Sequence, residues 1–292
     1  MQNKVYANPD ALVSADWLAA HLDDPAIRVV EVDVSPKSYD EGHIPGAVLW
    51  NIYRDLKDSS YRLIDGSALE NVLSASGITA STKVVFYGYG PALGYWLLKL
   101  YRHLDASILN LSKRQWQEEA RPWTTERPEP QAAHYALPEP NGEIRAVQSD
   151  VAASIGSADC AILDVRSEAE FRGERFWPSG ATEGAGRAGH IPGARNVALD
   201  AVVNSDGSYA PVDVLGGVFP GRFNDVPELI TYCTIGNRAS IAWFVLTELL
   251  GRRGGRVYDG SWAEWGLSST TPIEVGVLTP STQEPSLERT AY

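Results

Sequence analysis

Short apolar runs alternate with helical patterns along most of the chain. Four runs have the composition of buried strands: residues 27–33, 83–88, 160–166 and 228–233. The second and the fourth are each followed by an amphipathic helical pattern, at residues 93–104 and 238–251. Strands that alternate with helices in this way predict a mostly parallel sheet covered by helices on both faces. The pattern therefore predicts an α/β fold.

One phrase occurs twice, and the strands and helices around it repeat with it. GHIPG stands at residues 42–46 and again at 189–193, where a Gly-rich insert precedes it. The repeat predicts two similar α/β domains, residues 1–125 and 145–275. A Pro-rich, polar linker at 126–144 joins them, and residues 276–292 form a tail. Because proline and flanking glycines favour a sharp corner, we expect His43 and His190 to be structural.

Composition and charge narrow the classes of function. The 292 residues are 44% hydrophobic, enough for two domain cores. No apolar run is long enough for a membrane span, and the first residues lack the pattern of a secretory signal. Two cysteines make no disulfide framework, which favours a reducing, cytoplasmic location. The net charge of −12 argues against binding to nucleic acid or a lipid surface, and no Cys/His spacing predicts a metal site or cofactor.

One cysteine stands where a predicted strand meets a predicted helix. Cys233 ends the run at 228–233, and the C-terminal ends of parallel strands are where α/β sheets bind ligands. The following turn is short enough for its backbone N–H groups to converge on the sulfur; its residues are Thr234, Ile235, Gly236 and Asn237. The helix that starts near Arg238 adds its positive end. Such surroundings stabilise a thiolate without a general base, so Cys233 is the predicted nucleophile.

Arginines supply the local charge that an anionic substrate would need in an acidic protein. The guanidinium of Arg238 is a planar fork of donors suited to an oxyanion. Arg166 and Arg187 end segments expected at the same sheet edge, although Arg166 could instead pair with Asp164. Cys160 opens an apolar strand with no cation or glycine beside it in sequence, so we expect it to be structural.

The first repeat lacks these groups. Aligning the two copies puts Gly88 opposite Cys233, Leu93 opposite Arg238 and Ser35 opposite Arg166. The N-terminal domain is therefore expected to be catalytically silent. We expect it to wall one side of the Cys233 site and to limit access of water.

Five segments in this order resemble the rhodanese family in its tandem-domain form. They lie at residues 30–47, 163–171, 188–197, 232–246 and 258–266, and the resemblance covers roughly residues 10 to 275. It implies an inactive N-terminal and an active C-terminal rhodanese domain. It also implies thiosulfate:cyanide sulfurtransferase activity without a cofactor: Cys233 takes the outer sulfur of thiosulfate as a persulfide and passes it to cyanide or a thiol.

The loop sequence separates the alternatives within that family. The segment from Cys233 to Arg238 has six residues, one fewer than in phosphatase and arsenate-reductase relatives, which favours sulfur over phosphate. Relatives that use mercaptopyruvate typically carry Cys-Gly-Ser-Gly-Val-Thr without this arginine, whereas CTIGNR retains it. The loop also lacks the basic residues of the vertebrate thiosulfate enzymes. A 3-mercaptopyruvate sulfurtransferase and a persulfide carrier that serves a partner protein remain as alternatives.

Overall fold

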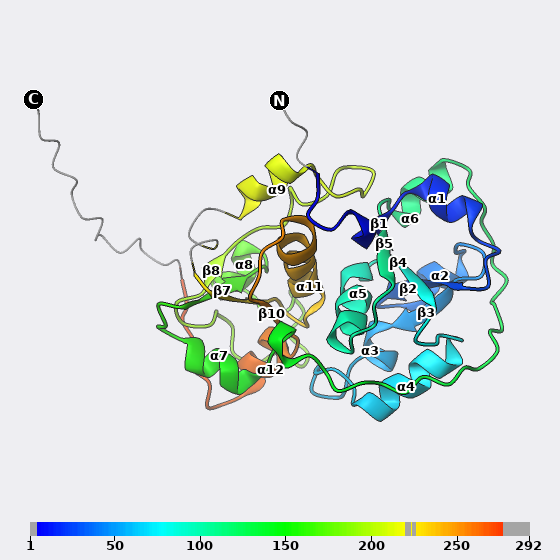
Figure 1. Cartoon of the computed structure of the whole chain (residues 1–292). Helices are drawn as coiled ribbons and strands as arrows, with labels where there is room; N and C mark the ends of the chain where they lie inside the picture. Colours follow the sequence, from blue (N-terminus) through cyan, green and yellow to red (C-terminus); the bar gives the residue numbers. More distant parts are fainter. Residues whose placement is uncertain (1–4, 220–222, 224–225, 277–292) are drawn as a thin grey trace, which may run out of the picture.

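The computed structural model describes residues 5–219, 223 and 226–276, and it contains two five-stranded sheets. Every strand pair in both sheets is parallel. The first sheet has the order β1-β5-β4-β2-β3 and the second has β6-β10-β9-β7-β8, which is the same topology. The two domains lie side by side (Figure 1), as the sequence repeat predicts.

The N-terminal domain holds the first sheet. Its strands are β1 (Leu12–Val13), β2 (Ile27–Asp33), β3 (Val48–Asn51), β4 (Lys83–Gly88) and β5 (Ala106–Leu109). Its helices are α1 (Ala15–Ala20), α2 (Pro36–Asp40), α3 (Ile52–Asp55), α4 (Gly66–Ala75), α5 (Pro91–Leu100) and α6 (Lys113–Glu118).

The C-terminal domain holds the second sheet. Its strands are β6 (Arg145–Ala146), β7 (Cys160–Asp164), β8 (Arg195–Asn196), β9 (Glu228–Tyr232) and β10 (Gly255–Tyr258). Its helices are α7 (Gln148–Ser154), α8 (Glu168–Phe171), α9 (Val212–Val218), α11 (Asn237–Phe244) and α12 (Ser261–Leu267). No helix in the described ranges is long and apolar enough to cross a membrane.

The central strands are apolar without interruption because both of their faces are covered. In β4, Val84 and Phe86 belong to one apolar cluster, while Val85 and Tyr87 belong to another. Successive side chains of a strand point to opposite faces, so two clusters mean that both faces of the sheet are buried. This confirms the predicted α/β architecture.

One apolar cluster extends through both domains. Helices α5 and α11 pack against each other, and the rings of Tyr95 and Phe244 meet edge to face at 4.9 Å. The same cluster includes Phe86 from the first sheet and Leu229 from the second. The facing sides of the two sheets therefore share a core, and the domains are not joined by the linker alone.

The predicted linker has no helix or strand from residue 125 to 141 and runs along the N-terminal domain (Figure 1). The N–H of Ala133 donates to the carbonyl of Ser74 at 3.1 Å, and the N–H of Asn141 donates to the carbonyl of Leu100 at 2.7 Å. The hydroxyl of Tyr135 lies 2.8 Å from Nδ1 of His103. The predicted tail lies, apart from its first residue, outside the described residues.

Both GHIPG segments form buried corners. The ring nitrogens of His43 lie 2.9 and 3.0 Å from backbone carbonyl oxygens, and Nδ1 of His190 lies 2.8 Å from another. Each histidine is almost fully buried. In both copies the next isoleucine donates its N–H to a tyrosine hydroxyl at 3.2 Å. These contacts are structural, as the Pro-Gly pattern predicts.

Candidate active site

Cys233 follows β9, a central strand of the second sheet, and directly precedes the loop into α11. Its side chain is buried, and Sγ accepts a hydrogen bond of 3.2 Å from the backbone N–H of Gly236. That N–H lies at the start of α11, where the helix presents its unpaired donors and the positive end of its dipole. Sγ therefore occupies an anion-stabilising position.

Gly236 has a left-handed backbone conformation at the turn from the loop into α11. It is the N-cap of α11 with φ +90°, in the left-handed region that favours glycine. A Cβ at this position would lie 2.8 Å from the carbonyl oxygen of Asp259. The requirement for glycine therefore comes from both the backbone angle and the lack of space.

The first turn of α12 contacts the backbone of the loop. The N–H of Cys233 donates to Oγ of Ser261 at 3.1 Å, and Ser261 has φ +52°. In return, the carbonyls of Cys233 and Thr234 accept N–H bonds of 3.0 and 2.8 Å from Trp262 and Ala263. Positive φ is uncommon for serine, so Ser261 is held in a strained backbone conformation beside Cys233.

Arg238 lies in the first turn of α11 and is paired with a carboxylate that the sequence analysis did not single out. Its Nη1 and Nη2 donate to the two oxygens of Glu170 at 3.0 and 2.8 Å, and Nη2 also donates to Oγ1 of Thr234 at 2.7 Å. The hydroxyl of Thr234 donates a hydrogen bond of 2.7 Å to the Glu170 carboxylate. The Arg238 side chain remains 27% exposed, so a ligand can still reach it.

Glu170 is buried, and its charge is held by these partners. Burial alone would raise the pKa of Glu170, but the hydrogen bonds and charge of Arg238 and the hydroxyls of Thr234 and Ser167 lower it to about 2. The same pair raises the pKa of Arg238 against the opposing effect of burial. A sequence signal for Glu170 exists: Ser167 and Glu170 form a capping box at the start of α8. The pattern does not reveal its contact with Arg238.

The side chain of Arg166 is fully buried. Its guanidinium bonds Asp164 at 2.6 to 3.1 Å and the carbonyl of Gly189 at 2.7 Å, and it stacks 4.5 Å from the Trp262 ring centre. From the sequence, Arg166 could contact a substrate or form an ion pair with Asp164. This geometry favours the ion pair. Arg187 likewise bonds backbone carbonyls near α12.

The remaining loop residues close the site on the side of the N-terminal domain. Ile235 and Asn237 are both buried, and Ile235 belongs to the core that the domains share. Oδ1 of Asn237 has no hydrogen-bond partner among the described residues, and a Cβ on Gly90 would lie 2.8 Å from it. The structure thus brings together Cys233, the four loop residues and Arg238, and it places Arg166 behind them.

A hairpin of the N-terminal domain also reaches the loop. Lys57 and Leu63 pair as its two sides, and we call it the 57–63 hairpin. Lys57 Nζ donates to the carbonyl of Asp259 at 2.9 Å, and the N–H of Leu63 donates to the Asp259 carboxylate at 2.9 Å. The Tyr61 ring lies 5.5 Å from that of Trp177. Nothing in the local sequence of the hairpin indicates these contacts.

The equivalent site in the first domain differs from the sequence alignment. Strand register places Val32 beside Gly88 and Asp164 beside Tyr232, so Asp33, not Ser35, is equivalent to Arg166. Both helices begin after a glycine N-cap, Gly90 in α5 and Gly236 in α11. The first loop is therefore one residue shorter, and Ala92 replaces Leu93 as the equivalent of Arg238. The absence of cysteine and arginine from these positions is unchanged.

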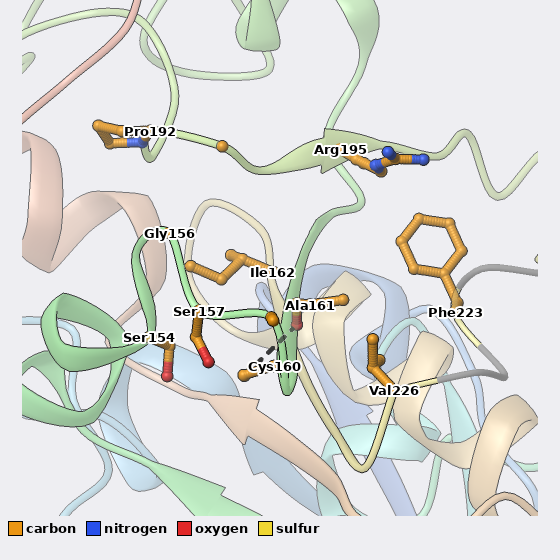
Figure 2. Close-up of a pocket in the computed structure, with 12 residues that line it drawn as sticks. Ser154, Gly156, Ser157, Cys160, Ala161, Ile162, Pro192, Arg195, Phe223 and Val226 are labelled. Carbon is orange, nitrogen blue, oxygen red and sulfur yellow. Dashed lines mark hydrogen bonds between the residues drawn. The ribbon is translucent and has the colours of Figure 1, made fainter. Parts of the chain in front are cut away.

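Cys160 occupies a different environment, at the opposite end of the second sheet. It is half-buried at the start of β7 and lines a pocket of about 250 Å³ together with Ser157 and Arg195 (Figure 2). Burial raises the pKa of the Cys160 thiol, and the charges of Arg252 and Arg256 do not offset it. This thiol is therefore less prepared for nucleophilic attack than a thiol held at a helix start.

Comparisons with known proteins identify the family to which the chain belongs. Residues 14–119 and 147–268 both match the Rhodanese-like domain, so the chain belongs to the rhodanese family. It is 40% identical over 287 residues to a protein of Haloferax volcanii named "Putative thiosulfate sulfurtransferase", covering 94% of this chain and 100% of the relative. It is also 40% identical over 281 residues to "Sulfur carrier protein TtuD" of Thermus thermophilus, covering 93% and 99%. The solved structure of wild-type EanB shares the fold, with a TM-score of 0.83, 23% identity and coverage of 93% of this chain and 70% of that one.

Proposed function

We propose that the protein is a thiosulfate sulfurtransferase that carries sulfur on Cys233 as a persulfide. The observation that carries the proposal is the buried Cys233 sulfur, which accepts the N–H of Gly236 at the start of α11. The names of the relatives from Haloferax volcanii and Thermus thermophilus, one for thiosulfate and one for sulfur transport, support the same chemistry.

The proposed reaction has two steps. The Cys233 thiolate attacks the outer sulfur of thiosulfate, the sulfur–sulfur bond of thiosulfate breaks, and its electron pair leaves with sulfite. The persulfide anion that remains stays within reach of the Gly236 N–H and the helix start. Cyanide or a thiolate then attacks the terminal sulfur, which regenerates the Cys233 thiolate and gives thiocyanate or an acceptor persulfide.

The donor is recognised by Arg238 and the loop. Arg238 offers a partly exposed guanidinium within the first turn after the loop, and its fork of donors fits the sulfonate end of thiosulfate. Thr234, Ile235, Gly236 and Asn237 shape the pocket around the sulfur. Arg166 acts as a framework residue that fixes Asp164 and Gly189 beneath the loop. A 3-mercaptopyruvate donor remains the alternative, which the ratio of kcat/KM for the two donors decides.

A second function is favoured by the likeness to the named sulfur carrier. In this version Cys233 forms the same persulfide but delivers it to a protein thiol, and small acceptors turn over slowly. We place either reaction in the cytoplasm, where two free cysteines remain reduced.

The test is intact-protein mass spectrometry after brief exposure to thiosulfate, before and after addition of cyanide. Wild-type protein is expected to gain the mass of one sulfur atom and to lose it again with cyanide. The Cys160→Ser variant should behave in the same way, whereas the Cys233→Ser variant should gain nothing. Sulfur transfer at full rate by Cys233→Ser would contradict the proposal.

A further inference from the structure

Lys57 is a cation that the N-terminal domain places inside the catalytic domain. It stands at the base of the 57–63 hairpin and is 4% exposed. Its Nζ donates to the carbonyl of Asp259 at 2.9 Å. A Cβ on Gly236 would lie 3.3 Å from Nζ, so the ammonium sits against the same glycine whose N–H bonds the Cys233 sulfur.

A buried ammonium needs an anion, and the nearest carboxylate is already used. Oδ1 and Oδ2 of Asp259 accept bonds of 2.7 and 3.1 Å from Arg145, and Oδ2 also accepts the N–H of Leu63. Burial lowers the pKa of Lys57, while the charges of Asp259 and then of Cys233 act in the opposite direction, with smaller effects of Arg145 and Asp58. Arg145 therefore offsets part of the Asp259 charge, and the Cys233 sulfur is the second anion that acts on Lys57.

We propose that Lys57 completes the Cys233 site by stabilising negative charge on its sulfur, both as thiolate and as persulfide. This rests on the proposed persulfide function and extends it by giving the N-terminal domain an electrostatic part in the chemistry. Lys57 acts through charge and does not contact the donor, so it is a positioning residue.

Other charged groups around the sulfur do not replace it. The guanidinium of Arg238 also acts on Cys233, but its charge is compensated by Glu170 through two hydrogen bonds. Tyr53, on α3, is the further titratable group that the sulfur influences. Its pKa is raised, first by burial and then by the charges of its neighbours, so it is neutral at physiological pH. Lys57 is thus a cation of the N-terminal domain whose charge interacts with that of the Cys233 sulfur.

The first experiment measures how fast iodoacetamide alkylates Cys233 as a function of pH. It uses full-length protein carrying Cys160→Ser, so that one thiol reacts. Lys57→Met removes the charge at similar volume, and the pH midpoint of alkylation is expected to rise by about one unit, which makes the reaction roughly tenfold slower at pH values below both midpoints. The matched control is Lys99→Met, because Lys99 also donates to a backbone carbonyl, that of Leu104, within the same domain. An unchanged midpoint in Lys57→Met would overturn the proposal.

The second experiment needs no change at Lys57. Coupling between two sites is reciprocal, so removing the sulfur charge must act on the lysine. Carbon and nitrogen NMR of the Lys57 side chain is expected to show it losing its proton at lower pH in Cys233→Ser than in wild type. Identical titrations of Lys57 in Cys233→Ser and in wild type would overturn the proposal. This test remains available if Lys57→Met fails to fold. Neither readout involves sulfur transfer, so a failure of persulfide formation in mass spectrometry would count against the proposed function and not against the coupling.

Discussion

An ion pair with Glu170 fixes the position of the Arg238 guanidinium in the site. Glu170 and Thr234 hold two nitrogens of the Arg238 guanidinium in fixed positions, and the exposed part of that side chain remains for a ligand. A pre-positioned arginine loses less side-chain freedom when an anion binds. The ion pair therefore positions Arg238 for donor binding. Glu170 compensates the positive charge of Arg238 when no donor is bound.

Replacing Arg238 with alanine should affect the donor half of the reaction. A hydrogen bond to a charged group is worth roughly 1.5–3 kcal/mol, so kcat/KM for thiosulfate is expected to fall about 10- to 150-fold. Steady-state kinetics with thiosulfate and cyanide measure this. The control is Arg172→Ala, because Arg172, the C-cap of α8, forms an exposed pair with Glu168. Unchanged kinetics in a folded Arg238→Ala protein would remove Arg238 from the donor site.

Glu170 should set part of the acid sensitivity of the fold. Its folded pKa of about 2 lies below the ordinary value of 4.5, so its contribution to stability is fully present above about pH 4.5. That contribution is lost as the pH falls toward 2. The shift corresponds to about 3 kcal/mol, at about 1.4 kcal/mol per unit. Urea unfolding at pH 7 and pH 3 should show a smaller loss of stability on acidification for Glu170→Gln than for wild type. Equal losses in both proteins would contradict this assignment.

At the scale of elements, the Cys233 loop depends on a single glycine. Gly236→Ala should destabilise the protein by about 1–3 kcal/mol, because alanine is strained at φ +90° and its Cβ would meet the Asp259 carbonyl. The matched control is Gly216→Ala in α9, where no atom lies within 4 Å of the added Cβ. This change should raise stability by about 0.5–1 kcal/mol. Thermal unfolding of the two variants measures both effects, and a Gly236→Ala protein as stable as wild type would show that the loop tolerates another backbone.

The sequence predicts elements well where one local pattern decides them. The runs of β4 and β9 are apolar because both faces are covered, and the GHIPG corners follow from proline and glycine geometry. The sequence predicts less well which positions of the two domains are equivalent, because this depends on strand register. Asp33 replaces Ser35 opposite Arg166 because the strand pairing, and not the end of the apolar run, sets the alignment.

Contacts between distant segments account for the part of the site that the sequence did not predict. Cys233, Gly236 and Arg238 lie within six consecutive residues, so their spacing in the sequence brings them together. Glu170 reaches Arg238 from α8, and Lys57 reaches Gly236 from the other domain. Neither residue type is unusual at its own position. The fold of the second domain brings α8 to α11, and the packing of the two domains brings Lys57 to Gly236.

At the scale of the whole molecule, the two domains form one structure around a shared core. Helices α5 and α11 pack directly, and the N-terminal segment crosses to the second domain, where the N–H of Ala7 donates to the carbonyl of Leu249. Most of the linker packs on the first domain, where Ala133 bonds Ser74 and the Tyr135 hydroxyl lies 2.8 Å from His103. A cut after residue 140 therefore keeps the linker with the domain it packs on.

Separating the chain at that point should abolish activity without yielding two independent enzymes. Residues 1–140 are expected to fold, because α5 of the same fragment packs on β2, β4 and β5 and a separate apolar cluster lies on the other face of the sheet. They should show no sulfur transfer, because Gly88 replaces the cysteine. Residues 141–292 should lose solubility or most of their turnover. Their apolar face against α5 would be exposed, and Lys57 would be missing.

Circular dichroism, light scattering and transfer of sulfur from thiosulfate to cyanide measure the three outcomes, with the intact chain as reference. Mixing the two halves gives the control, since rebuilding the interface should restore part of the activity if the first domain contributes Lys57 and a wall of the site. A soluble 141–292 fragment as active as the whole chain would reject both contributions. The first domain would then be a binding module for a partner, such as a protein that accepts sulfur.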